Sequence, residues 1–263
     1  MTKLTWPAES TDTSAKRAEV QLLAAQALAI LAKQTAVTPP HLTERLVRLS
    51  DLVIALDPDI AHQAIDDVIR EGLGIDDVID HLLPEIARML GERWFADDIS
   101  FAEVSIGSAR LQEMVRRLRM RRRAVNNVHG PDKRVLIIIP RPEEHTLGAF
   151  IAADQLRRAD VSVEMSIAER RRELEARLRE NRYHMVGITA SGVRTLAAVK
   201  EIVGVIRSKC RTFTPIVLGG PLADADRALT DRLKVDVMTT DIRSAARRCG
   251  VLSARQEKDT EVG

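Results

Sequence analysis

The sequence has few cysteines, few aromatic residues and no long apolar run. Two cysteines, Cys210 and Cys249, in 263 residues are too few for a disulfide framework or a cysteine-rich zinc site. Aromatic residues make up 3% of the chain, which argues against the stacking surfaces that bind single-stranded nucleic acid. No apolar stretch approaches the roughly 20 residues that span a bilayer, and residues 1–14 are too polar for a signal peptide. We therefore expect a reduced, cytoplasmic protein.

The net charge is also small. A formal charge of +2 at pH 7 lies far below what a dedicated DNA-binding protein usually carries. Hydrophobic residues make up 45% of the chain and charged residues 30%, as is typical of a globular protein with a packed core. The length allows one large domain or two ordinary ones.

The first half of the chain shows apolar residues only at helical spacing. Its periodicity and its start and stop signals predict helices at about residues 20–31, 42–56, 58–72 and 75–94 and from residue 100 onward. Asp57 is the expected N-cap of the third helix, Pro84 should interrupt the fourth, and Ser100 and Glu103 form a capping box. We expect a flexible N-terminus (1–14), a helical bundle (15–123) and a linker (124–130).

The second half, residues 131–250, alternates strand and helix patterns. Strands are expected at about residues 135–139, 161–167, 185–189, 215–218 and 235–238, and helices at about 147–158, 170–181, 195–208, 223–233 and 242–249. Five such units predict an α/β fold with a doubly wound, flavodoxin/Rossmann-like, five-stranded parallel sheet. The residues that follow, 251–263, are expected to form a disordered tail.

Three loops at the carboxyl ends of the predicted strands form a candidate site, because doubly wound sheets bind their ligands there. The loops carry Glu143-x-His145-x-x-Gly148, then Ser191-Gly192-Val193, then Gly219-Gly220. Between Gly148 and Ser191 lie 42 residues (149–190), and between Ser191 and Gly219 lie 27 (192–218). A single histidine or glycine pair would mean little, but all three motifs in this order indicate one binding site.

The three motifs together resemble the cobalamin-binding signature DxHxxG…SxL…GG. The resemblance implies that His145 replaces the cofactor's own benzimidazole as lower axial ligand of cobalt, a metal that imidazole binds well. It implies that the Glu143 carboxylate holds the other ring nitrogen and raises its basicity. Gly148 would let the following helix approach the corrin. Glu143 stands where the family has Asp.

The same resemblance implies a slot beside the sheet for the displaced nucleotide tail of the cofactor. Ser191 would hydrogen-bond the tail, and Gly219 and Gly220 would remove side chains where it passes. Val193 stands where the family has Leu, a mild change in packing.

The helical half resembles the cap that precedes cobalamin domains, including those of light-sensing transcription regulators. In those caps a tryptophan is followed, after nine residues, by Glu-His, which covers the upper axial face. Trp94 is present here, but Val104 and Ser105 occupy the Glu-His positions. The resemblance implies that these three residues face the cofactor. The missing pair favours hydroxo- or aquocobalamin, with adenosylcobalamin as the alternative.

The combination of cap, cobalamin motif and missing DNA-binding head is most similar to the AerR/PpaA antirepressors of photosynthetic bacteria. The resemblance implies a non-enzymatic, cobalamin-binding photoreceptor that controls a DNA-binding transcriptional repressor of photosynthesis-type genes. It would show little sequence-specific DNA binding itself. Two alternatives are a corrinoid methyl carrier serving separate methyltransferases, and an interaction module whose cofactor site has decayed.

Two arginine clusters stand apart from these motifs. Residues 116–123 contain six arginines at a predicted helix C-terminus, where the helix dipole favours cations. They could be a solvated helix end, an acidic-partner surface or a phosphate contact. Residues 170–172 are three arginines at a helix start, where the dipole disfavours them, and a partner-binding role is one interpretation.

Overall fold

The protein is described by a computed structural model over residues 40–123, 133–141, 143–210, 212–225 and 229–253. The chain divides into two compact units, Met1–Arg121 and Arg122–Gly263. The predicted flexible N-terminus, the helix at 20–31 and the linker at 124–130 lie outside the described residues. In the described part of the chain, no helix combines the length and apolarity needed to cross a membrane.

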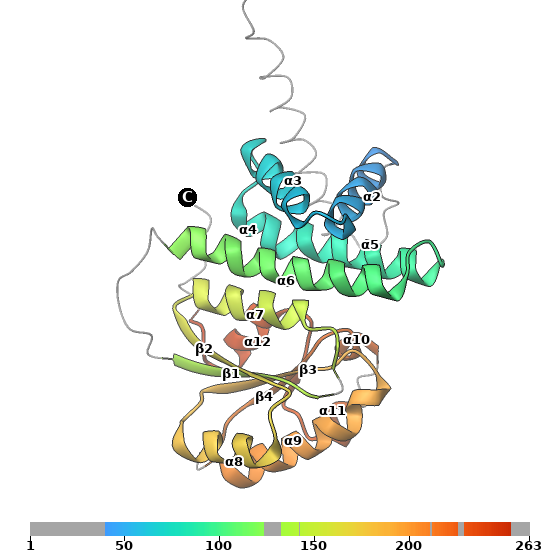
Figure 1. Cartoon of the computed structure of the whole chain (residues 1–263). Coiled ribbons are helices and arrows are strands. Elements are labelled where there is room, and N and C mark those ends of the chain that lie inside the picture. Colours follow the sequence, from blue (N-terminus) through green and yellow to red (C-terminus); the bar gives the residue numbers. More distant parts are fainter. Residues whose placement is uncertain (1–39, 124–132, 142, 211, 226–228, 254–263) are drawn as a thin grey trace, which may run out of the picture. The chain divides into compact units, whose positions relative to one another are not determined.

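The first unit is helical, as its periodicity predicts (Figure 1). Its elements are α2 (Pro40–Ile54), α3 (Pro58–Arg70), α4 (Ile75–Asp77), the π-helical η1 (Val78–Leu82), α5 (Leu83–Phe95) and α6 (Phe101–Arg123). Apolar side chains at helical spacing are fully buried in it, including Ile65, Leu83, Leu90 and Leu111. This burial is the main source of stability for helices of this length.

The helix boundaries follow the predicted capping residues. The Asp57 carboxylate accepts from the Asp59 N–H at 2.9 Å, and Gly72 has φ +112° just beyond the end of α3. The Ser100 N–H donates to Glu103 at 2.7 Å, and the Glu103 N–H donates to Ser100 Oγ at 3.2 Å. Both predicted caps are therefore confirmed.

The helix predicted at 75–94 is interrupted near Pro84, as expected. The interruption takes the form of the π-helical turn η1 between α4 and α5, with Pro84 in the first turn of α5. Proline has no N–H and its ring crowds the carbonyl four residues earlier, so the regular hydrogen-bond pattern cannot continue through it.

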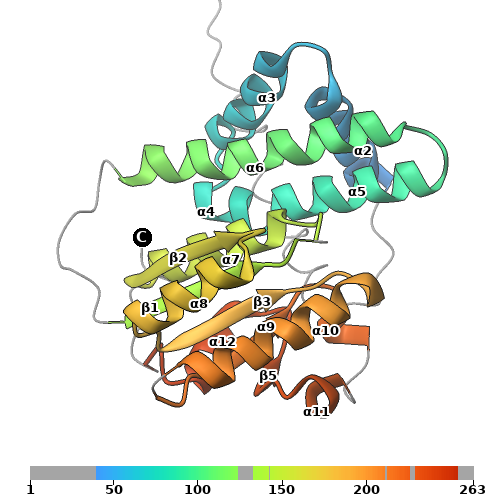
Figure 2. The same cartoon turned by 60° about the horizontal axis from the view of Figure 1, so that its bottom comes forward.

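The second unit is a five-stranded parallel sheet of order β2-β1-β3-β4-β5 (Figures 1 and 2). The strands are β1 (Lys133–Ile139), β2 (Val161–Ile167), β3 (Met185–Thr189), β4 (Ile216–Gly219) and β5 (Val237–Met238). The helices are α7 (Leu147–Arg158), α8 (Arg171–Glu180), the 3-10 turn η2 (Val193–Thr195), α9 (Leu196–Lys209), α10 (Leu222–Ala225), α11 (Leu229–Leu233) and α12 (Ile242–Arg248). The predicted fold is confirmed.

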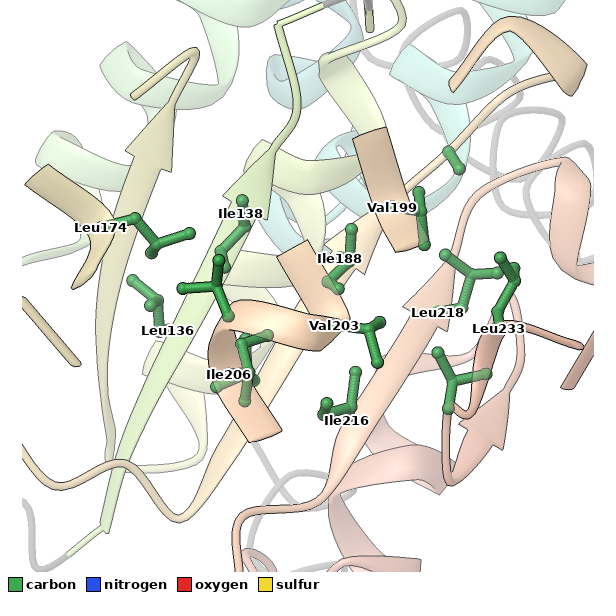
Figure 3. Close-up of a cluster of buried hydrophobic side chains, with 14 of the residues drawn as sticks. Leu136, Ile138, Leu174, Ile188, Val199, Val203, Ile206, Ile216, Leu218 and Leu233 are labelled. Carbon is green, nitrogen blue, oxygen red and sulfur yellow. The ribbon is translucent and has the colours of Figure 1, made fainter. Parts of the chain in front are cut away.

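The sheet is buried on both faces, which explains its continuous apolar strands. On one face, Leu136 and Ile138 pack with residues of α8 and α9 (Figure 3). On the other face, Val135 and Ile137 pack with α7 and α12. Successive residues of β1 therefore serve opposite cores.

The helix expected at 223–233 is helical over Leu222–Ala225 and Leu229–Leu233, and residues 226–228 between them lie outside the described residues. One sequence prediction is wrong in this unit. The expected tail is not free at its start, because Val251 and Leu252 are 5% and 9% exposed and join the core of α7 and α12. Gly250, at φ +69°, turns the chain back after α12, and the Val251 N–H donates to Ala246 O at 2.8 Å.

Candidate cofactor site

The predicted site lies at the carboxyl edge of the sheet, where β1, β3 and β4 end side by side. Ile138 of β1 is paired with Ile188 of β3, and Thr189 of β3 with Gly219 of β4. Because parallel strands end at the same edge, the loops that follow them come together. The Ala190 N–H also donates to Gly219 O at 2.9 Å, which joins two of these loops.

Glu143 is the centre of the site. Its residue is only 5% exposed, and its carboxylate receives contacts from two loops. Oε1 accepts from the His145 N–H at 2.7 Å and from Ser191 Oγ at 2.9 Å, and Oε2 accepts from the Ser191 N–H at 2.6 Å. Burial opposes the charged form, but the hydrogen bonds from His145 and Ser191 outweigh it and lower the pKa of Glu143. The buried carboxylate is therefore ionised at neutral pH.

His145 is the exposed end of this cluster, with 72% of its side chain accessible. Its Nδ1 lies 3.2 Å from Glu143 Oε1, and this hydrogen bond raises the pKa of His145. When the ring is neutral and Nδ1–H donates to the carboxylate, Nε2 carries the lone pair. The geometry thus fits a metal-binding imidazole oriented by a carboxylate.

A single imidazole suits a metal that arrives with most of its coordination positions filled by a macrocycle, such as the cobalt of a corrin. Within the described ranges, no group of three or more His, Cys, Asp or Glu side chains is placed to hold a metal ion. His145 meets the requirement of an axial ligand, because it is exposed, has one engaged nitrogen and has one nitrogen left for the metal.

The position of Ser191 refines the sequence prediction. We predicted that its side chain binds the nucleotide tail, whereas its hydroxyl and its N–H both contact Glu143. The glutamate, one methylene longer than the family's aspartate, reaches across to the neighbouring loop. Sequence reasoning missed this contact, although the adjacency of the two loops was its signal. Ser191 thereby holds the carboxylate that holds His145.

The glycines of the motif differ in whether the surrounding structure leaves room for a side chain. Gly220 has φ +93°, and a Cβ built there would lie 2.6 Å from Ala190 O, so only glycine fits. At Gly219 a Cβ would meet Thr239 O at an ordinary 3.6 Å, and at Gly148 it would meet no atom within 4 Å. The predicted roles of Gly148 and Gly219 toward the cofactor stay predictions, as does that of Val193, whose backbone begins η2.

The predicted upper-face residues lie in the helical unit. Trp94 is 47% exposed, and its ring centroid is 6.1 Å from that of Phe101. Val104 is half-buried, and exposed Ser105 donates its hydroxyl to the carbonyl of Phe101 at 2.8 Å. These side chains offer an aromatic surface and a hydroxyl that is already hydrogen-bonded to a carbonyl of its own helix. Their predicted contact with the cofactor stays a prediction.

Comparisons with known proteins identify the family of the α/β unit. Residues 133–248 match the B12 binding domain family. An uncharacterized 20.5 kDa protein in the bchF-crtJ intergenic region of Rhodobacter capsulatus is 30% identical over 168 residues, 64% of this chain and 88% of the relative. The solved monomethylamine corrinoid protein of Methanosarcina barkeri is 11% identical, with a TM-score of 0.61 over 78% of this chain and 95% of its own, and shares the fold.

Proposed function

The chain belongs to the B12-binding domain family, and on that premise we propose that it is a cobalamin-dependent regulator in which His145 is the lower axial ligand of cobalt. The observation that carries the ligand assignment is the cluster of Glu143, His145 and Ser191. A buried, ionised carboxylate orients an exposed imidazole by one nitrogen and leaves the other for the metal. Cobalamin supplies the cobalt and, with a labile upper ligand, a response to light.

The regulatory part of the proposal draws on the relative in Rhodobacter capsulatus, which is encoded between bchF and crtJ. That position supports a link to photosynthesis-type genes. We infer that the cobalamin-bound protein acts as an antirepressor by binding a DNA-binding repressor. For this to work, cobalamin must bind more tightly to the partner-competent state than to the other state.

The arginine cluster at 116–123 supports protein binding more than sequence-specific DNA recognition. Arg117 and Arg121 both pair with Asp66, at 2.6 Å and 2.5 Å, so part of the cluster is neutralised within the helical unit. Arginine contacts to phosphates would in any case carry no base readout. The cluster therefore suits an acidic protein surface at least as well as DNA.

The test uses the full chain loaded with hydroxocobalamin and the host's DNA-binding repressor on its promoter. We expect the loaded protein to release the repressor from DNA and the cobalamin-free protein to do so less. His145→Ala should abolish the difference. His184→Ala is the matched control, because His184 accepts from the Arg134 N–H at the opposite end of β3. Absorption spectra before and after illumination show whether light changes the bound cofactor.

Two results would contradict the regulatory proposal. One is a footprint of the pure protein on a defined promoter that survives near-physiological salt, because that would show direct sequence reading. The other is methyl transfer through the bound cofactor by added methyltransferases without any effect on the repressor, which would favour the corrinoid carrier.

A further inference from the structure

The α/β unit holds a cavity of about 340 Å³ that the cofactor motifs do not explain. It opens at the carboxyl ends of β1 and β2, between the start of α8 and the side of α9. Ile138 and Leu174 belong to its lining and to the core of α8 and α9, not to the core of α7 and α12. The volume is within the range of small-molecule sites.

The inner lining of the cavity is apolar. Ile138 of β1, Leu174 of α8, and Ile202 and Val205 of α9 contribute to it. Such a surface suits a hydrocarbon chain or a planar ring, because moving apolar ligand surface out of water onto an apolar lining is favourable.

The rim of the cavity is basic. Arg141, Arg170 and Arg171 line it together with Glu169 and Glu201. Arg171 Nη1 lies 3.3 Å from Glu201, which pairs those two charges. Arg141 Nε donates at 3.2 Å to the carbonyl of Ala168, a neutral partner.

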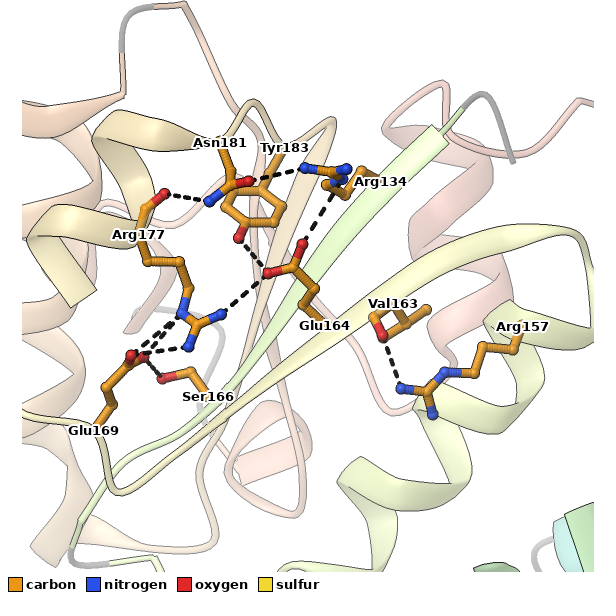
Figure 4. A network of polar contacts seen from close by, with 9 residues as sticks. All are labelled: Arg134, Arg157, Val163, Glu164, Ser166, Glu169, Arg177, Asn181 and Tyr183. Carbon is orange, nitrogen blue, oxygen red and sulfur yellow. Dashed lines mark hydrogen bonds and ion pairs between the residues drawn. The ribbon is translucent and has the colours of Figure 1, made fainter. Parts of the chain in front are cut away.

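Glu169 does not offset the remaining cations. Its carboxylate accepts from Ser166 Oγ and from Arg177 Nη2, the latter at 3.0 Å (Figure 4). Burial opposes its charge, but Arg177 and Ser166 together lower the pKa of Glu169. The glutamate is therefore ionised and paired with Arg177. Within the part of the chain that the structure describes, neither Arg141 nor Arg170 forms an ion pair.

Helix α8 begins at the same place, with Arg170 as its N-cap. The Arg170 N–H donates to the carboxylate of Glu173 in the first turn at 3.0 Å, so this helix end already has one anionic partner. The Arg170 side chain has no acceptor for the other first-turn N–H groups, and a cation at a helix N-terminus is unfavourable, so a bound anion would relieve both effects. The rim thus combines two guanidinium groups without carboxylate partners and a helix start, above an apolar lining.

We propose that this cavity binds a small phosphate monoester with an apolar or aromatic body. The phosphate contacts Arg141 and Arg170, whose forked donors match its oxygens, and the body rests on Leu174 and Ile202. The site is separate from the predicted tail slot at Ser191 and Gly219-Gly220, and it does not depend on cobalamin binding.

The experiment is calorimetric titration of the full chain with phenyl phosphate, inorganic phosphate and benzyl alcohol. We expect phenyl phosphate to bind at least about tenfold more tightly than either of the other two, because only it uses both rim and lining. Arg170→Gln should weaken its binding about tenfold. Arg172→Gln is the matched control: it removes an adjacent exposed arginine outside the cavity and should change binding less than about twofold.

A second variant tests the cavity itself. Ala198 lines it, and Ala198→Phe should fill the space and abolish phenyl phosphate binding while the circular dichroism spectrum stays unchanged. If phenyl phosphate does not bind, binds no better than inorganic phosphate, or loses as much affinity in Arg172→Gln as in Arg170→Gln, the site does not exist. If loading with hydroxocobalamin abolishes binding, the cavity belongs to the cofactor and the proposal of a separate site is wrong.

Discussion

In the α/β unit, Glu143 accepts hydrogen bonds from two loops. In the helical unit, Trp94 and Ser105, which are predicted to face the upper side of the cofactor, contact Phe101. The carboxylate of Glu143 is buried and is held by His145 and Ser191. By contrast, Ser105 donates to the carbonyl four residues earlier, and Trp94 is half exposed beside Phe101.

This difference bears on two properties: the affinity for cobalamin and the selectivity between its upper ligands. A ligand whose orientation is fixed by a buried, fully bonded carboxylate binds its metal with little reorganisation. A surface of exposed aromatic rings offers contact area but no directed polar group. We therefore expect affinity to come mainly from the lower axial side, and selection between upper ligands to be weak.

Removing the centre of the lower site should have the largest effect. Glu143→Ala leaves the Ser191 N–H and the His145 ring without their acceptor, and it should weaken hydroxocobalamin binding about 100-fold. Glu144→Ala is the control, because the adjacent side chain is exposed. Equilibrium dialysis measures both. If Glu143→Ala and Glu144→Ala bind hydroxocobalamin equally tightly, the contacts of Glu143 do not determine affinity, and the contrast between the lower and upper sides is wrong.

Ser191→Ala should have a smaller effect, about tenfold, because the backbone N–H of residue 191 still donates to Glu143. A double-mutant cycle with Glu143→Ala separates two roles for Ser191. If the serine acts through the carboxylate, its effect on binding disappears in the Glu143→Ala background. If the effect persists in full, Ser191 contacts the cofactor directly, as the sequence prediction has it.

The pH dependence should reveal the same contact. The hydrogen bond to Glu143 raises the pKa of His145, so the imidazole gains its proton at a higher pH than an isolated histidine would. Since only the neutral ring binds cobalt, ligation should be lost as pH falls through this raised pKa. In the cobalamin-free protein, Glu143→Gln should lower the pKa of His145 in an NMR titration. An unchanged pKa would show that the carboxylate does not hold the ring.

The upper side should show the smallest effect. Hydroxocobalamin should bind in the dark at least as tightly as adenosylcobalamin, but no more than about threefold more tightly. Restoring the family's pair with Val104→Glu and Ser105→His should shift the ratio toward adenosylcobalamin. A clear adenosyl preference in the unaltered protein would contradict the view that this side is unselective.

Much of the fold could be predicted because local signals and the final structure agree. The strand at 161–167 and the helix at 147–158 have the expected bounds, and Asp57, Ser100 and Glu103 cap as their chemistry requires. The departures depend on tertiary contacts. Val251 and Leu252 look like a tail in sequence, and only the turn at Gly250 brings them to the core.

The members of the site and the contact of Glu143 with the His145 ring were predictable, but the contacts of Ser191 with Glu143 were not. The order of the motifs placed Glu143, His145 and Ser191 at one edge of the sheet. The two bonds from Ser191 to Glu143 depend on how far a glutamate reaches between loops, which no periodicity encodes. The lining of the basic cavity comes from β1, β2, α8 and α9, so no single sequence motif predicts it.

The most direct test of the ligand assignment is electron paramagnetic resonance of the full-length protein carrying cobalamin in the Co(II) state. The unpaired electron of low-spin Co(II) couples to the axial nitrogen, which gives triplets with ordinary nitrogen and doublets with nitrogen-15. In protein made with nitrogen-15 histidine we expect doublets, and His145→Ala should lose them. Triplets that persist in the labelled protein would show that the cofactor's own benzimidazole still occupies the lower position, and that His145 is not the ligand.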